Sequence, residues 1–465
     1  MKTEFKSILV LLVFVVSFGS LQAQTNDISG NWSGMIQLPG MQLKTIYKIH
    51  QVDGKFEGTF DVPQQSATNL PLGEIILLGD SVKIKVPVIL GSFEGKFFSA
   101  DSITGKWMQN GQTFDLNLKR TGDFAAAQRP QTPVPPFPYL SEEVEYTNPE
   151  SGLKLAGTLT FPKDAKNCPA VVLITGSGAQ DRDETIYEHK PFFVIADYFA
   201  RNGITTLRVD DRGVGGSEGN ISSATSEDLA TDVLAGVDYL KSRKEIDPGN
   251  IGLLGHSEGG VIAPIAATKS DDVAFIVMMA GPGTVGEELL YEQGELTMRA
   301  SGMPDFAIKQ QKFVQKAIFD VLKNEPDSAK AAEKLRKNLS QGMYDGMNEQ
   351  MKKLIDEQIN SVNTNWFRHL LTYDPIPTLE KVECPVLAIN GAKDVQVPVS
   401  NLEKIYDAVT SSGNQNIDTV RFENLNHLFQ QSETGAVSEY SEIEQTIDPK
   451  VLETIKDWIA RITLK

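Results

Sequence analysis

Residues 255–259 of the chain read Gly-His-Ser-Glu-Gly, and this pentapeptide constrains the fold more than any other segment. The apolar run Ile-Gly-Leu-Leu precedes it at 251–254, and a small-residue pattern typical of a tightly packed helix follows at 260–267. A strand that turns directly into a helix strains the backbone, and a Cβ atom on either flanking glycine would collide with a neighbouring element. The pattern predicts a sharp elbow that holds Ser257 at the edge of a sheet.

A serine hydroxyl is a poor nucleophile unless a histidine accepts its proton and a carboxylate orients that histidine. In sites built on such an elbow, the acid and then the histidine follow the serine along the chain. Among the five histidines of the sequence, only His369 and His427 lie beyond Ser257. His427 lies in a polar loop after a strand-like segment, whereas His369 lies in a charged helical region. His427 is therefore the predicted base.

The predicted acid is Asp394. It follows the buried-strand pattern of residues 385–390 and lies in the segment 391–398, at the carboxyl end of a strand. Polar residues in such loops meet at one edge of an open α/β sheet. Asp374 and Glu423 are the alternative carboxylates, and each would require a rearranged site.

A glycine-rich loop offers the hydrogen-bond donors that a negatively charged tetrahedral intermediate needs. The apolar strand pattern of residues 170–174 breaks into the loop 175–183, whose glycines allow backbone N–H groups to turn toward the serine. We assign the two donors to the backbone N–H groups of Ser177 and of Glu258, the residue after the nucleophile.

These elements together resemble the α/β-hydrolase superfamily, and more narrowly its bacterial secreted esterases of the EstD-like kind. The resemblance covers about residues 142–465. It rests on the elbow, on the loops of Asp394 and His427, and on two motifs, Gly-Ser-Gly-Ala-Gln-Asp-Arg-Asp at 176–183 and Asp-Asp-Arg-Gly-Val-Gly-Gly-Ser at 210–217. It implies hydrolysis of carboxylic esters with short to medium acyl chains through an acyl-enzyme on the elbow serine. The related serine aminopeptidases and acyl-thioester hydrolases make amide and thioester hydrolysis the alternatives.

The charge of the chain bears on its partners. The formal net charge is −17, and an acidic surface disfavours binding to nucleic acid or to an anionic membrane, because both need a basic face. The sequence has no Cys-x-x-Cys and no histidine pair at helical spacing, so neither a metal nor a cofactor is predicted. Cys168 and Cys384 each lie just before a predicted strand, and in a hydrolase sheet two other strands separate these two strands. The sulfur atoms should therefore be too far apart for a disulfide, and both cysteines are expected to be unpaired and buried. The expected partner is a small-molecule ester.

Residues 1–23 are predicted to be a signal peptide. Lys2 and Lys6 form a positive region ahead of an apolar stretch at 8–18 that is too short to span a bilayer. Leu-Gln-Ala at 21–23 fits a cleavage site. No cysteine follows that site, so a lipoprotein anchor is not indicated, and no later segment has the apolar length of a transmembrane helix. The mature protein is expected to be periplasmic or secreted.

Residues 24–122 are expected to form a small antiparallel β domain. Short alternating runs separated by turn signals such as Val-Asp-Gly at 52–54 predict a sandwich or barrel. Trp32 and Trp107 recur in similar Gly-x-Trp contexts and are interpreted as core anchors, with a ligand cup as the alternative. The domain is a candidate for binding a glycan or the cell surface. A proline-rich linker, 123–140, is expected to act as a semi-rigid spacer.

Residues 141–465 are expected to form the catalytic domain, in which strands and helices alternate to build a doubly wound, mostly parallel sheet. Charged helical stretches interrupt this alternation at about 283–378 and predict a helical cap over the catalytic edge. Most of the apolar side chains of the cap are expected to pack on the body, and a minority to line the acyl pocket. Asp210, Asp211 and Arg212 are interpreted as a structural network that braces the neighbouring loop.

Overall fold

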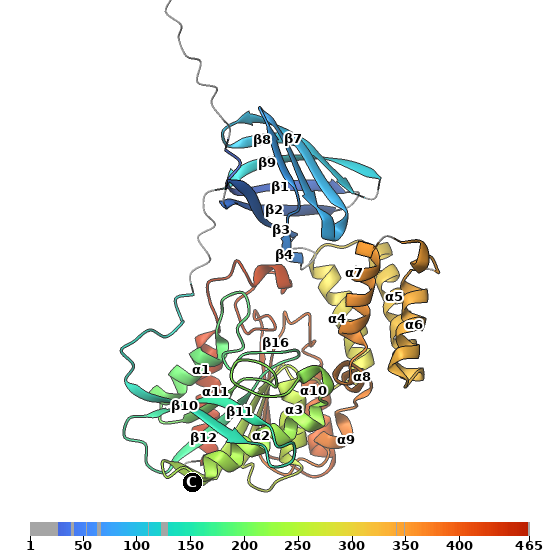
Figure 1. The fold of residues 1–465 in the computed structure, drawn as a ribbon. Coiled ribbons are helices and arrows are strands. Elements are labelled where there is room, and N and C mark those ends of the chain that lie inside the picture. The colour runs from blue at the N-terminus through green and yellow to red at the C-terminus, as the bar shows by residue number, and fades with distance from the viewer. Residues whose placement is uncertain are drawn as a thin grey trace, which may run out of the picture.

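The computed structural model describes residues 27–38, 41–52, 54–62, 67–109, 111–121, 129–340, 342–347 and 349–463. The predicted signal peptide lies outside these residues. The described chain forms two separate sheets, with a small all-β domain ahead of residue 122 and a mixed α/β domain after residue 138 (Figure 1). Every helix among the described residues is too short or too polar to cross a membrane.

The first sheet is antiparallel throughout, with the strand order β4-β3-β2-β1-β9-β8-β7-β6-β5. Its strands are β1 (Gly30–Leu38), β2 (Met41–Val52), β3 (Lys55–Val62), β4 (Ala67–Pro71), β5 (Ile75–Leu78), β6 (Ser81–Val86), β7 (Gly91–Ser99), β8 (Ser102–Gln109) and β9 (Gln112–Thr121). Strong curvature makes it a half-barrel with β4 and β5 as its two edges (Figure 1). Residues along β6 alternate between buried and exposed, the period that a sheet with one covered face requires.

The core of the half-barrel is filled by aromatic side chains. Trp32 and Trp107 are both buried, and the Trp107 ring stacks on Phe60 with the ring centroids 5.2 Å apart. The Trp32 indole N–H donates a hydrogen bond to the carbonyl oxygen of Ile28 at 2.8 Å. Both tryptophans are thus core anchors, as the sequence predicts.

The second sheet has the strand order β10-β11-β13-β12-β14-β15-β16-β17. Its strands are β10 (Tyr139–Thr147), β11 (Lys154–Pro162), β12 (Cys168–Ile174), β13 (Thr205–Val209), β14 (Ile246–His256), β15 (Phe275–Met279), β16 (Val386–Gly391) and β17 (Ile417–Phe422). β11 pairs antiparallel with both β10 and β13. The six strands β13-β12-β14-β15-β16-β17 are parallel to one another. This is the mostly parallel, doubly wound sheet expected from the sequence.

Helices cover both faces of this sheet. Two separate apolar clusters hold them in place, one formed with α2, α3 and α10 and the other with α1 and α11. These helices are α1 (Pro191–Arg201), α2 (Ser226–Lys241), α3 (Gly259–Ala267), α10 (Asn401–Ser411) and α11 (Pro449–Thr463). Because the central strands are buried on both sides, they read as continuous apolar runs rather than alternating ones. Cys168 and Cys384 are free, as expected, but both are half-buried rather than fully buried.

The cap lies between β15 and β16 and stands apart from the sheet as a bundle (Figure 1). Its helices are α4 (Gly286–Ala300), α5 (Asp305–Asn324), α6 (Ser328–Leu339), α7 (Glu349–Val362) and α8 (Asn365–Thr372), and the short α9 (Ile376–Leu379) returns the chain to the sheet. Its buried apolar residues, among them Phe319, Leu335 and Ile359, form a cluster of their own. The expectation that most of them pack on the body is therefore wrong, because these helices are numerous enough to enclose a separate core.

The proline-rich segment lies against the catalytic domain over residues 129–138, and residues 122–128 lie outside the described chain. The Gln131 side chain accepts hydrogen bonds from the backbone N–H groups of 446–447. The Arg129 guanidinium donates hydrogen bonds of 2.7–3.1 Å to the carbonyl oxygens of Tyr187, Ser441 and Ile443. The described part of the linker is thus a docked strap. Proline density predicts its extended backbone but carries no information about the carbonyl groups that receive its side chains.

We predict that a truncated chain starting at Arg129 is more stable than one starting at Tyr139. The shorter chain leaves three backbone carbonyl groups without the Arg129 guanidinium, and hydrogen bonds to charged groups contribute about 1.5–3 kcal/mol each. The free energy of unfolding from guanidinium denaturation, followed by circular dichroism, should differ by at least about 1.5 kcal/mol. Equal free energies would mean that the strap contributes nothing to the stability of the domain.

Candidate active site

Ser257 occupies the elbow between β14 and α3, with φ at 52°. A positive φ is costly for a residue with a side chain and persists where the surrounding structure enforces it. A Cβ atom on Gly255 would overlap the carbonyl oxygen of Gly259, and one on Gly259 would overlap the carbonyl oxygen of Ile174. Both flanking positions therefore require glycine, for the steric reason inferred from the sequence.

The candidate base and acid contact each other directly. His427 Nδ1 lies 2.8 Å from Asp394 Oδ2, and both side chains are buried. The other carboxylate oxygen of Asp394 accepts hydrogen bonds of 2.8 Å from the backbone N–H groups of Gln396 and Val397. His427 lines the same cavity as Ser257. The structure thus brings the three candidates to one edge of the sheet, with the acid fixed from behind.

The alternative residues lie elsewhere. Glu423 forms an exposed ion pair with Arg421 at 3.0 Å. Asp374 accepts a hydrogen bond from the backbone N–H of Ile376 at 3.0 Å, just ahead of α9. His369 lies on α8 of the cap, and none of these alternative residues lines the cavity of Ser257.

The glycine-rich loop runs alongside the elbow. A Cβ atom on Gly176 would lie 3.2 Å from the Cβ atom of Ser257, so the two backbones are in close contact. The Gly176 N–H is occupied, since it donates a hydrogen bond of 2.7 Å to Glu184 Oε1. Ser177 and Glu258 both line the cavity, and within the described chain neither of their backbone N–H groups has an acceptor. Both groups are thus free to serve as the donors assigned from the sequence.

A buried ion pair beneath the elbow was missed by sequence reasoning. His256 Nδ1 lies 2.9 Å from Glu184 Oε1, and its Nε2 lies 3.0 Å from the backbone carbonyl oxygen of His427. The backbone carbonyl can only accept and a Glu184 carboxylate accepts as well, so the arrangement matches an imidazolium with a proton on each nitrogen. Burial alone would lower the pKa of His256, but the adjacent Glu184 carboxylate and the His427 carbonyl outweigh burial and raise it.

This pair joins three loops. His256 belongs to the elbow, the Glu184 carboxylate binds the N–H of Gly176 in the glycine-rich loop, and the His256 ring binds the backbone of the loop that carries His427. In the sequence, His256 occupies a variable position of the elbow motif and Glu184 is one of several acids in a polar loop. No spacing or periodicity connects them, so the sequence alone gave no signal for the pair.

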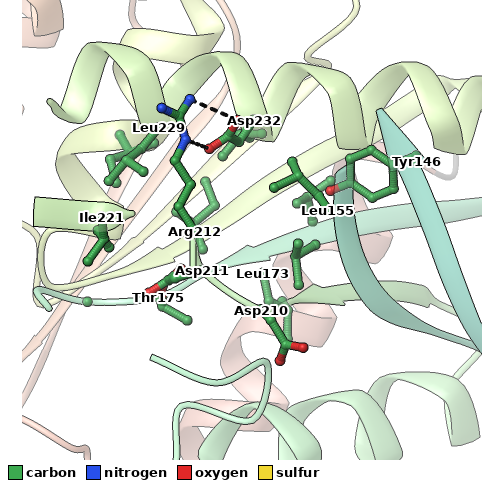
Figure 2. A pocket seen from close by; sticks show the side chains of 16 residues that line it. Tyr146, Leu155, Leu173, Thr175, Asp210, Asp211, Arg212, Ile221, Leu229 and Asp232 are labelled. Atoms are coloured by element: carbon green, nitrogen blue, oxygen red, sulfur yellow. Dashed lines mark hydrogen bonds and ion pairs between the residues drawn. The ribbon is translucent and has the colours of Figure 1, made fainter. Parts of the chain in front are cut away.

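A small cavity of about 50 Å³ lies behind the glycine-rich loop (Figure 2). Asp211 accepts hydrogen bonds there from the Thr175 hydroxyl at 2.7 Å and from the Gln180 N–H at 2.8 Å. Burial raises the pKa of Asp211 to about 7. Arg212 turns to the other side and pairs with Asp232 of α2 (Figure 2). Asp210 also accepts a hydrogen bond of 2.9 Å from the Arg182 N–H of the loop. These contacts support the interpretation of Asp210 and Asp211 as a brace for the loop, whereas Arg212 ties the segment to α2.

The cavity at Ser257 has a volume of about 460 Å³ and lies between the sheet edge and the cap. Two carboxylates line it, those of Glu184 and Glu258. Its apolar lining comes mainly from α4, the end of α7 and α8, namely Leu289, Leu290, Val362, Trp366, Phe367 and Leu370. A minority of the apolar cap residues therefore reaches the cavity, as expected. Within the described residues, no three His, Cys, Asp or Glu side chains are arranged to hold a metal ion.

Comparisons with known proteins place these features in context. The family described as X-Pro dipeptidyl-peptidase (S15 family) matches residues 151–429. Esterase EstD of Thermotoga maritima is 27% identical over 325 residues, which cover 68% of this chain and 70% of that protein. An uncharacterized 31.7 kDa protein of Escherichia coli is 25% identical over 228 residues, or 46% of this chain and 71% of that protein.

Solved structures of low sequence identity are also similar. The Pyrococcus furiosus esterase Pf2001 matches with a TM-score of 0.43 and 16% identity, covering 70% of this chain and 93% of its own. The alpha/beta hydrolase GrgF from Penicillium sp. sh18 matches with a TM-score of 0.44 and 18% identity, covering 70% of this chain and 100% of its own.

We predict that His256→Gln destabilises the protein by about 3–5 kcal/mol, because it leaves the Glu184 carboxylate buried without a cation. The double variant Glu184→Gln/His256→Gln should be less destabilised, since it buries no unpaired charge. The measurement is the free energy of unfolding in urea between pH 6 and 9.

The pH dependence of this effect has a definite sign. A histidine with a raised pKa in the folded state stabilises fully below its unfolded pKa of about 6.5, and this stabilisation disappears as the pH rises through the folded value. The stability difference between the wild type and the double variant should therefore shrink at alkaline pH. A constant difference across that range would contradict a charged His256.

Proposed function

The chain belongs to the family described as X-Pro dipeptidyl-peptidase (S15 family), which matches more than half of its length, and within that family we propose that it is a serine hydrolase of carboxylic esters. Its catalytic domain has the α/β-hydrolase fold. The observation that carries the proposal is the hydrogen-bonded pair of His427 and Asp394 at the cavity into which the strained Ser257 elbow opens. The similarity to a protein named as an esterase supports ester hydrolysis.

In the proposed reaction, the Ser257 Oγ attacks the acyl carbonyl carbon while His427 Nε2 takes the hydroxyl proton. Asp394 holds the other ring nitrogen and stabilises the imidazolium that forms. The oxyanion of the tetrahedral intermediate accepts hydrogen bonds from the N–H groups of Ser177 and Glu258. The intermediate collapses and expels the alcohol, which takes the proton from His427. A water molecule, deprotonated by the same histidine, then hydrolyses the acyl-enzyme.

The cavity favours an uncharged acyl group. A substrate with a free amino terminus needs a carboxylate near the scissile bond whose charge is not already balanced by a cation of the protein. Glu184 is paired through Oε1 with His256, and Glu258 accepts hydrogen bonds from the side chains of Ser226 and Trp366. Burial also raises the pKa of Glu258, which weakens it as a partner for an ammonium group. We therefore propose ester substrates with short to medium acyl chains, which suit the apolar lining from the cap.

Peptide hydrolysis is the second candidate, because the description of the family names an X-Pro dipeptidyl-peptidase.

We also propose that the protein is exported to the periplasm or the medium, because residues 1–23 have the pattern of a signal peptide. The side chains of Trp32 and Trp107 are buried, so they offer no aromatic surface on which a glycan could stack, and glycan binding by the first domain has no support from them.

We predict that Ser257→Ala lowers ester turnover by at least about 10³ and leaves the fold intact, because only binding and the oxyanion donors remain. Asp394→Asn should lower turnover by up to about 10⁴ by disfavouring the required tautomer of His427. The matched controls Asp374→Asn and Glu423→Gln should stay within a few-fold of the wild type. A fluorophosphonate probe followed by peptide mass spectrometry should find the label on Ser257. Label on another residue would refute the assignment.

We also predict a clear order of substrates. Aryl esters of graded acyl length should be hydrolysed best at short to medium chains, and Xaa-Pro anilides with a free amino group should be much poorer substrates. Acetylated Xaa-Pro anilides serve as the matched control, because they lack only the charge. If the free amine improved kcat/KM over the acetylated form, an ammonium site would exist and the peptidase alternative would hold.

A further inference from the structure

The side chain of Glu258 is a buried charged group that the proposed chemistry does not use. Only its backbone N–H has a role in that chemistry, yet its carboxylate lies in the cavity wall and is 3% exposed. The Ser226 hydroxyl donates a hydrogen bond of 2.8 Å to Oε1. The Trp366 indole N–H lies 3.1 Å from Oε1 and 3.0 Å from Oε2.

The two donors come from different parts of the fold. Ser226 is the first residue of α2 and is buried in the body of the catalytic domain. Trp366 belongs to α8 of the cap, and its ring lines the cavity. One carboxylate therefore joins the body and the cap, while its own backbone lies beside Ser257.

Burying a carboxylate in this place is unfavourable. Removing an ion from water costs several kcal/mol, and here burial raises the pKa of Glu258 while the hydrogen bonds from Ser226 and Trp366 oppose that rise. An apolar side chain of similar size would fill the same volume without this cost. An apolar side chain cannot fix the angle and distance of two donors at once, whereas hydrogen bonds to a carboxylate can.

We propose that the Glu258 carboxylate is a positioning residue that couples the cap to the oxyanion hole. It holds the Trp366 indole against the elbow, and it fixes Glu258 itself, whose backbone N–H is one of the two groups that receive the oxyanion. This inference rests on the proposed function, because the oxyanion hole is defined by Ser257 as nucleophile. It follows that the Glu258 donor is in place when α8 is seated on the elbow, and that the position of the cap affects the chemical step as well as substrate binding.

The test is a double-mutant cycle on the full mature chain. Glu258→Gln keeps the shape of the side chain and removes its charge, and Trp366→Phe keeps an aromatic ring and removes the N–H donor. The matched controls are Asp418→Asn and Trp458→Phe, because the Trp458 indole N–H donates a hydrogen bond of 2.8 Å to Asp418 Oδ2 on the β17 and α11 side of the domain. The measurements are kcat and KM on a short aryl ester and the rate at which a fluorophosphonate labels Ser257.

Losing an oxyanion donor lowers turnover by about 10²–10³, and a displaced donor should cost less, so we expect Glu258→Gln to lower kcat about 10-fold or more. KM for a short ester should change by less than about 3-fold, and the labelling rate should fall in parallel with kcat. Trp366→Phe should act in the same direction. The double variant should be no worse than the poorer single variant, because both changes break one connection. The control pair should lower stability and leave kcat unchanged.

Three outcomes would overturn the inference: multiplying losses in the double variant, a wild-type kcat in Glu258→Gln, or a change confined to KM. If Glu258→Gln fails to fold, Trp366→Phe alone tests the coupling, since it leaves the carboxylate in place. A wild-type kcat and labelling rate in Trp366→Phe would refute the coupling. Failure of the proposed function looks different, because the wild type itself would then carry no label on Ser257.

Discussion

The contact between the backbone of Gly259 and the carbonyl oxygen of Ile174 sets the geometry on which the rest of the active site depends. Because no side chain fits there, α3 begins directly against the end of β12, and the glycine-rich loop that continues β12 passes beside Ser257. The nucleophile and its oxyanion donors are therefore positioned by backbone packing. The strain at Ser257 persists because the surrounding strands and helix leave the elbow no alternative path.

The two residues beside the nucleophile are anchored in different directions. His256 is bound below the elbow by Glu184 and by the backbone of the base loop, and Glu258 is bound toward α2 and the cap. Their electrostatics also differ, because His256 and Glu184 form a charged pair whereas Glu258 has only neutral donors. Removing either partner of the charged pair leaves a buried ion, while removing one donor of Glu258 leaves a hydrogen bond unmade. We expect the pair of His256 and Glu184 to matter mainly for folding, and the hydrogen bonds of Glu258 to matter mainly for catalysis.

The sequence predicted the elements that obey local rules. Glycine sterics identified the elbow, apolar runs identified the parallel strands, and chain order together with strand-end loops led to Asp394 and His427. Side-chain pairings over long distances in the sequence left no such trace. Glu184 and His256 are 72 residues apart and Glu258 and Trp366 are 108 residues apart, with no period or motif connecting either pair. For the same reason the cap was located correctly but its separate core was not foreseen.

The docked strap at Arg129 also limits how far the two domains can separate. Eight peptide steps join Thr121 to Arg129, and a fully extended chain of that length reaches at most about 29 Å. Confinement within a sphere of that radius corresponds to an effective concentration on the order of 10 mM. An exposed contact such as Lys44 with Glu442, at 3.2 Å, would be negligible between free molecules. At that local concentration, weak contacts between the half-barrel and the catalytic domain form far more often than they would between free molecules, so the tether strengthens these contacts without adding one of its own.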